Sequence, residues 1–211
     1  MKKVIIAAAS LALSGAAVAG PDELSWTYLD AGYVLQSGTG TTLADEGGDG
    51  YKLRGSFGLN LFHFGGEWYQ VDGGSNNIEG RPDAGDIDSW DLYVGVHPGI
   101  TDNIDLVVDV GYTESENDRD DKTDGVFLRV GPRAMIGEHF ELSVYLMSTW
   151  GDTDFSAGEG LDNITQFSDN FRGVTLQVGG QWYFTDHFSL GADARLEDTG
   201  DNVNLFARWS F

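Results

Sequence analysis

The feature that most constrains this chain is a two-residue alternation of apolar and polar side chains that recurs from Leu24 onward. In residues 104–113, the odd-numbered positions include Asp105 and Asp109, whereas the even-numbered ones are Ile, Leu, Val, Val and Tyr. Successive strand residues point to opposite faces, so the pattern predicts strands with one apolar and one polar face. We find ten such segments, at roughly residues 24–36, 50–61, 64–72, 87–98, 104–114, 125–136, 140–150, 172–184, 188–198 and 202–211.

The connections between these segments alternate between long and short. Four long ones are rich in Gly, Asp, Asn and Ser, at 37–49, 73–86, 115–124 and 151–171. Four short ones lie near 62–63, 99–103, 137–139 and 185–187, and a tight connection at 199–201 falls on the long-loop side. Short turns at one end and longer loops at the other are typical of bacterial outer-membrane barrels. We therefore predict an all-β fold, a transmembrane up-and-down antiparallel β-barrel of ten strands.

The N-terminal residues have the pattern of an export signal. Lys2 and Lys3 precede the apolar run 4–13, and Ala17 and Ala19 form an A-x-A-like cleavage site. The apolar run is too short for a spanning helix, which needs about 20 apolar residues. We predict a signal peptide at 1–19 and a single barrel domain at 20–211.

Aromatic residues on the apolar faces gather at both ends of the predicted strands. Those near the short turns are Phe64, Phe140, Trp182, Phe184, Phe188, Trp209 and Phe211. Those near the long loops are Tyr33, Tyr51, Trp90, Tyr112 and Trp150. Two aromatic girdles around an apolar band match the two lipid–water interfaces. A soluble sandwich or lipocalin-like barrel, with its apolar faces packed inward, is the alternative.

The polar faces carry charges of both signs, whereas the rest of the chain is almost uniformly acidic. The whole chain has 12 basic and 34 acidic residues, for a net charge of −22. Fourteen charged side chains share the polar faces and form a predicted lumen network: Asp30, Lys52, Arg54, Glu67, Asp91, Asp105, Asp109, Arg129, Arg133, Glu141, Asp193, Arg195, Glu197 and Arg208. The acidic balance argues against nucleic acid as a partner, because that binding needs cations that neutralise phosphates. The chain has no Cys and so no disulfide framework.

Hairpin register predicts which of these charges meet. If Asp109 faces Arg129 across the loop 115–124, then Asp105 faces Arg133. Across the turn centred on Gly137, Arg133 would face Glu141. Cross-strand pairs of opposite charge are favourable, so we expect Arg133 between the two carboxylates.

The chain resembles the outer-membrane β-barrel domain superfamily of small OmpA-, OmpX- and OmpW-like proteins. The most specific part is the last strand, residues 205–211, which alternates and ends in Trp209, Ser210 and Phe211. The resemblance implies that Trp209 and Phe211 signal to the barrel-assembly machinery, with periplasmic chaperones acting earlier. Many of these relatives have eight strands, so eight is the alternative to our count of ten.

Enzymatic chemistry is not expected. Ten-stranded barrels include the omptin proteases, which place an Asp/His pair at the extracellular rim. Here the four histidines map to the short-turn end, where we interpret them as interfacial turn residues: His63, His97, His139 and His187. A general base must lie within hydrogen-bond reach of its substrate, and none of these reaches the long-loop carboxylates.

No dedicated metal site or cofactor is expected either. The densest acidic run, residues 114–124, does not match the calcium-binding EF-hand loop, because the third position counted from Asp120 is Lys122. A solvated, self-repelling rim accounts for such a run. Weak association with divalent cations, bridging lipopolysaccharide phosphates, is the alternative.

These observations predict a non-enzymatic protein of the bacterial outer membrane, with periplasmic termini and extracellular loops. Its partners would be outer-membrane lipids and lipopolysaccharide, met through acidic loops in surface interaction or envelope integrity. Ten strands lie near the size at which side chains fill a barrel, so we expect a closed lumen. Tyr69, Tyr93, Tyr145 and Phe206 would narrow it further. A narrow porin-like channel for small solutes or cations is the alternative.

Overall fold

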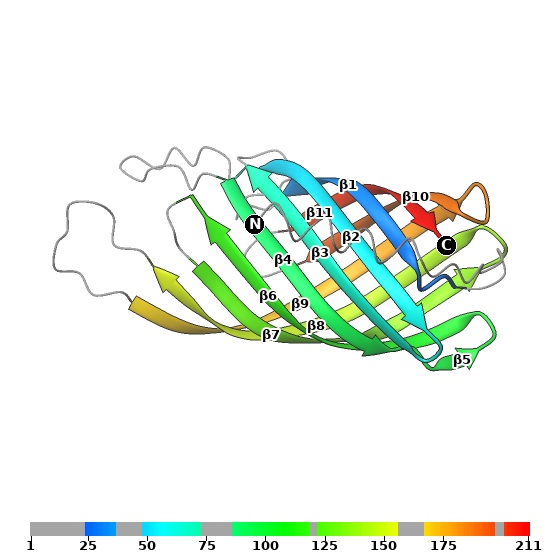
Figure 1. Cartoon of the computed structure of the whole chain (residues 1–211), viewed down its shortest axis with the longest axis horizontal. Coiled ribbons are helices and arrows are strands. Elements are labelled where there is room, and N and C mark those ends of the chain that lie inside the picture. The colour runs from blue at the N-terminus through cyan, green and yellow to red at the C-terminus, as the bar shows by residue number, and fades with distance from the viewer. Residues whose placement is uncertain (1–23, 37–47, 73–85, 119–121, 156–166, 197–200) are drawn as a thin grey trace.

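The computed structural model describes residues 24–36, 48–72, 86–118, 122–155, 167–196 and 201–211. The described residues form an antiparallel β-barrel of ten long strands and one three-residue strand, β5 (Figure 1). The strands are β1 (Tyr28–Gln36), β2 (Asp49–Leu59), β3 (Phe62–Asp72), β4 (Asp86–Val96), β5 (Gly99–Thr101), β6 (Ile104–Asn117), β7 (Lys122–Ile136), β8 (Phe140–Phe155), β9 (Phe167–Tyr183), β10 (Phe188–Leu196) and β11 (Asn202–Ser210).

Neighbouring strands in the sequence pair with one another, and two further pairings close the barrel. Strand β1 pairs with β11, and β4 pairs with β6 past the short β5. Every backbone edge of the ten-stranded wall therefore has a neighbour, which is what a sheet needs in order to lie in hydrocarbon. The ten-strand prediction is confirmed, and the eight-strand alternative is wrong. None of the described residues forms a helix long and apolar enough to cross a membrane.

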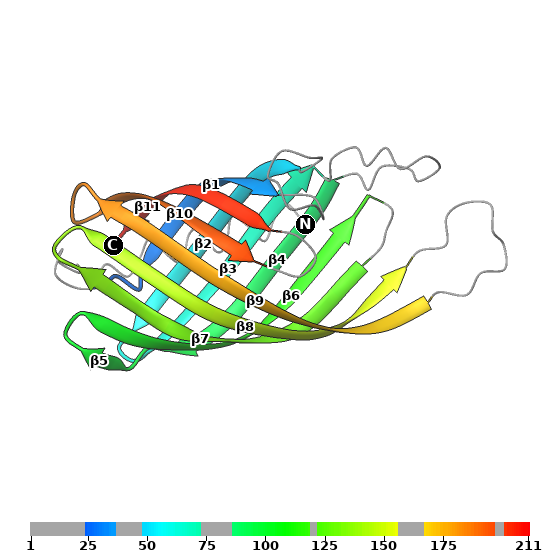
Figure 2. The ribbon, with the colours of Figure 1, turned by 180° about the vertical axis from the view of Figure 1, so that it is seen from behind.

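The short connections lie at one end of the barrel, together with the C-terminus, and β6–β9 project furthest at the other end (Figures 1 and 2). The turn between β2 and β3 consists of Asn60 and Leu61 alone, since Leu59 pairs directly with Phe62. Asn60 has φ 52°, a left-handed conformation that Asn adopts more readily than most residues. We predicted this turn near 62–63, and that error hid the orientation of His63.

Other predicted boundaries are also wrong. Strand β1 begins at Tyr28 rather than at residue 24, and residues 24–27 lie outside the strand. Strands β6 to β9 run several residues into the predicted loops 115–124 and 151–171. The sequence of these extensions lacks the regular apolar alternation, although the backbone pairing continues.

Several predictions lie outside the described residues. They are the signal peptide with Ala17 and Ala19, the lumen residue Glu197, and the interiors of the long loops. The signal peptide and its cleavage therefore stay predictions.

The wall of the barrel has an apolar outer face and a polar inner face. Large apolar side chains at mid-strand, such as Leu92, Val110, Leu146 and Leu205, are more than half exposed on the outside. Outward aromatic rings pack at both ends, with Trp90 against Tyr112 toward the long loops and Phe184 against Phe188 at the short turns. The buried side chains are mostly polar or charged, so the usual arrangement of a water-soluble protein is reversed.

Candidate functional site

The charged side chains of the inner face form the candidate site. They come from alternate positions of nine strands, because every second residue of each strand points into the lumen. Within the described part of the chain, the network consists of Asp30, Lys52, Arg54, Glu67, Asp91, Asp105, Asp109, Arg129, Arg133, Glu141, Asp193, Arg195 and Arg208.

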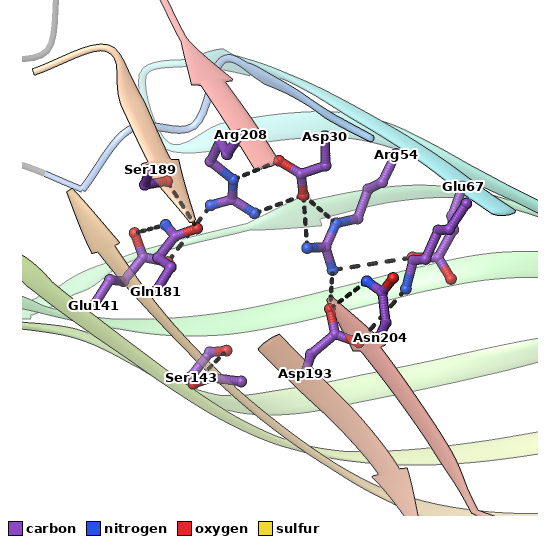
Figure 3. Close-up of polar contacts among 12 residues, drawn as sticks. Asp30, Arg54, Glu67, Glu141, Ser143, Gln181, Ser189, Asp193, Asn204 and Arg208 are labelled. Carbon is purple, nitrogen blue, oxygen red and sulfur yellow. Dashed lines mark hydrogen bonds and ion pairs between the residues drawn. The ribbon is translucent and has the colours of Figure 1, made fainter. Parts of the chain in front are cut away.

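Asp30 of β1 is the centre of this network (Figure 3). Its carboxylate accepts two hydrogen bonds from Arg208, Nε to Oδ1 at 2.7 Å and Nη2 to Oδ2 at 3.0 Å. Arg54 of β2 approaches Oδ2 with Nε at 2.7 Å and Nη2 at 2.6 Å. Two guanidinium groups thus share one carboxylate whose side chain is 2% exposed. Such charge-assisted pairs fix the orientation of both arginines.

From Arg54 the ion pairs continue to the opposite wall. Arg54 Nη1 lies 3.4 Å from Asp193 on β10. Glu67 on β3 accepts from Lys52 at 2.9 Å and forms a short contact with Arg195. Arg195 in turn lies 3.7 Å from Asp91 on β4.

In the other direction the network reaches β7 and β8. Arg208 Nη1 lies 3.6 Å from Glu141, which accepts from Arg133 Nε at 2.7 Å and from Nη2 at 2.9 Å. Glu141 also accepts hydrogen bonds from Gln181 and Tyr183 of β9. One continuous set of contacts therefore runs from β4 through the lumen to β7 and β9.

A second group of charges lies beside the first. Arg129 donates to Asp109 at 2.7 Å, and its guanidinium lies between the rings of Tyr93 and Tyr145, 4.7 and 5.3 Å from their centroids. His63 Nε2 lies 2.7 Å from the other oxygen of Asp109. Both side chains of this His–Asp pair are almost completely buried.

These contacts fill the barrel. Arg208 packs over the ring of Tyr28 at 3.6 Å, and Arg54 lies 5.1 Å from the centroid of Phe206. The cavity that remains among the lumen side chains has a volume of about 50 Å³, room for a few water molecules. A second cavity of about 380 Å³ lies at the short-turn mouth, lined by residues that include Trp26, His97, Asp105 and Phe211.

The predicted neighbours of Arg133 are only partly right. Arg133 and Asp105 are register partners, and so are Arg129 and Asp109. The Arg133–Glu141 contact is present, but the predicted register is wrong, because Arg133 faces Ser143 and reaches Glu141 diagonally. Asp105 instead accepts a hydrogen bond from Trp26 Nε1 at 3.0 Å.

The interpretation of all four histidines as interfacial turn residues is wrong for two of them. His63 is 1% exposed and points into the lumen, and the side chain of His97 is 10% exposed. His139 and His187 do lie in the turns, next to Trp182 and Trp209. Once the turn is placed at 60–61, His63 belongs to β3 and lies four residues before Glu67, so both side chains point to the same, inner face.

Trp26 and Tyr28 were not among the predicted lumen residues. Both lie an even number of residues from Asp30 and so fall on the same face of the chain. Trp209 points outward and is half exposed, and Phe211 donates its backbone N–H to Thr27 O at 3.0 Å. Their role as an assembly signal stays a prediction. No group of three or more His, Asp or Glu side chains suited to a metal ion occurs in the described ranges.

Comparisons with solved structures find similar barrels at low sequence identity. The KdgM porin is 10% identical, with a TM-score of 0.44, over 87% of this chain and 99% of its own. The attachment invasion locus protein Ail of Yersinia pestis, solved with the heparin analogue sucrose octasulfate, is 17% identical, with a TM-score of 0.40, over 87% and 96%. The outer-membrane protease OmpT of Escherichia coli is 10% identical, with a TM-score of 0.49, over 89% and 94%.

No family model and no curated protein matches the sequence. The narrower resemblance to OmpA, OmpX or OmpW stays a prediction. Small outer-membrane β-barrels are among the solved structures that this chain resembles.

Proposed function

We propose that this protein is a non-enzymatic component of a bacterial outer membrane, a barrel closed to solutes that acts through its extracellular rim. The observation that carries the proposal is the ion-pair network, which runs across the lumen around a cavity of only about 50 Å³. The reversed faces of the wall support the location, because apolar side chains facing outward need lipid around them. The short-turn end would then face the periplasm and the long loops the exterior.

The exterior end is rich in carboxylates on the outer face. Glu114 of β6 faces Asp124 of β7, which faces Asp152 of β8. Like charges directly opposite one another are unfavourable, and Lys122, 3.0 Å from Glu114, offsets them only in part. This rim is the part of the protein that we expect to meet lipopolysaccharide, with divalent cations between carboxylates and phosphates.

Absence of catalysis is part of the same proposal. The His63–Asp109 pair would be the natural candidate for a general base, but neither side chain is accessible. The pair also lies toward the short turns, at the far end from the loops that would meet an external substrate. A base must reach its substrate, and this one does not.

Single-channel conductance of the refolded mature protein in a planar bilayer tests closure. At neutral pH we expect no steps from protein whose folding is shown by its heat-dependent electrophoretic mobility. The matched variant W26A/D30A/R54A/R208A removes Trp26 at the short-turn end of the lumen cavity together with the centre of the network, one carboxylate with both of its guanidinium partners, and we expect it to conduct. Regular steps from the unaltered protein would contradict the proposal and favour a narrow porin-like channel.

A further inference from the structure

The segment that precedes β1 folds into the short-turn mouth of the barrel. Thr27 Oγ1 accepts a hydrogen bond from the backbone of Gly58 at 3.1 Å, and Thr27 O accepts from Phe211 at 3.0 Å. Ser25 and Thr27 are 4% and 5% exposed. Both chain ends of the barrel domain are thus tied to this mouth.

Trp26 lies in a socket made by three strands and a turn. Its ring stacks on His97 with centroids 4.0 Å apart, and on His63 at 4.6 Å. The guanidinium of Arg133 lies 4.5 Å from the ring centroid, and Asp105 accepts the indole N–H at 3.0 Å. The indole therefore contacts four polar or charged side chains, which is unusual for a side chain placed only to fill space.

Trp26 also lies between the lumen cavity and the mouth cavity, since it lines both. The lumen cavity is lined by side chains that include His63, Arg133 and Glu141, and the mouth cavity by His97 and Asp105. Among the described residues that line them, Trp26 alone lines both. Movement of this one side chain would join the lumen to the mouth.

We propose that residues 24–27 form an acid-released gate, with Trp26 as the seal between the lumen and the periplasm. The assignment of this end to the periplasm rests on the proposed function, whereas the seal between two cavities does not. The gate gives access to the lower lumen, and the ion-pair network above it still blocks passage through the barrel. The proposal and the closed-barrel function can therefore fail separately.

The acid response comes from His97, which packs against Trp26 and His63. His97 lies just beyond the end of β4 and faces Asp105 of β6, Arg133 of β7 and His63 of β3. His63 faces Asp109 of β6, which also holds Arg129, and it meets the ring of Tyr93 of β4. A proton on His97 would place a second positive charge near Arg133, while Asp105 already accepts the hydrogen bond of the Trp26 indole.

The direction in which pH changes the stability of the closed state follows from His97. Its burial is the largest effect and lowers its pKa, and His63 lowers that pKa further while Asp105 opposes the change. A released His97 would titrate near its ordinary pKa of about 6.5. The closed state therefore gains stability from neutral His97 above that pH and loses it as the pH falls.

Cysteine labelling tests the gate without relying on conductance. The chain has no Cys, so S143C places a single thiol in the lumen cavity, to be modified by a cationic methanethiosulfonate reagent. At neutral pH we expect S143C to react at least about tenfold more slowly than W26A/S143C, because only the open fraction reacts. At about pH 5 the two rates should converge, and H63Q/H97Q/S143C should stay slow.

Thiol chemistry alone would have the opposite pH dependence, since the thiolate is the reactive form and acid removes it. A rate for S143C that rises in acid relative to H63Q/H97Q/S143C, which carries the same thiol, therefore supports the gate even if W26A/S143C fails to fold. Equal rates with and without Trp26 at neutral pH, or a ratio of the S143C rate to the H63Q/H97Q/S143C rate that does not change as the pH falls, would overturn the proposal. Folding of each variant is verified by its heat-dependent mobility.

Discussion

Asp30 is the residue on which most of the lumen depends. One buried carboxylate orients Arg54 and Arg208, and through them it links β1, β2 and β11. A buried pair of charges contributes little net stability compared with apolar residues of the same shape. Removing one partner is different, because the remaining charges are left uncompensated in a place without water.

We therefore predict that D30N is strongly destabilised. The substitution keeps the size of the side chain but leaves two guanidinium groups without their carboxylate, a loss of about 3–5 kcal/mol in the free energy of unfolding. Urea unfolding in lipid vesicles, followed by tryptophan fluorescence, measures it. The control D186N changes an exposed turn carboxylate and should stay within about 0.5 kcal/mol of the unaltered protein. Equal stability of D30N and D186N would show that the network is not structurally important.

The lumen charges could be read from the sequence, but their contacts only in part. Alternation alone indicates that Asp109 and Arg129 lie on the same face. The register of an antiparallel hairpin, in which the residue numbers of facing partners have a constant sum, then predicts that they face each other, as they do. The contact between Arg195 and Glu67 joins strands that are far apart in sequence and not neighbours in the sheet. Such contacts across a lumen depend on the closure and diameter of the barrel. The position of Trp26 was missed for the same reason, since its partners come from β3, β6 and β7.

At the scale of elements, β7 and β8 show how closely backbones approach in this wall. Their register partners run from Lys122 to Val130 and resume at Arg133, so the pairing is interrupted at Gly131 and Pro132. Pro132 has no N–H to donate, and proline within a sheet is confined to edges and irregularities. A Cβ added at Gly131 would lie 1.9 Å from the backbone oxygen of Val144. Glycine is required here because the neighbouring strand itself occupies the space.

G131A should therefore destabilise the barrel by about 1–3 kcal/mol, as overpacking does elsewhere, or displace β8. The matched control is G173A on β9, where a Cβ would meet nothing within 4 Å. The midpoint temperature of the change in electrophoretic mobility compares the two variants. If G173A lost as much stability as G131A, the close approach of β8 would not be the cause.

Strand boundaries were the weakest predictions for a physical reason. Inside the membrane the alternation is enforced by lipid on one side and the lumen on the other, and there the predicted strands match. Above it, β8 and β9 continue with water on both sides, as the pair of Asp152 with Asn170 illustrates. Their register pairing continues there without an alternation of side-chain hydropathy from which it could be predicted.

At the scale of the whole molecule, the reversed faces and the closed lumen together make the central claim. The outer face consists mainly of apolar residues such as Leu and Val, and the inner face carries paired charges. Each face is stable only in its own surroundings. Without lipid the outside would aggregate, and without the ion pairs the buried charges would be uncompensated. The number of strands and the charged face were both predictable, because each follows from alternation.

Spin labels on single cysteines, with the refolded protein in vesicles, test this claim most directly. V110C and L146C lie on the outer face of β6 and β8, and S143C lies in the lumen. We predict that the two outer labels collide often with oxygen, which dissolves in lipid, and rarely with a water-soluble nickel chelate. At neutral pH the label at position 143 should collide rarely with either. Frequent collisions of the outer labels with the nickel chelate, or of the lumen label with it, would contradict the lipid-facing wall or the closed lumen respectively.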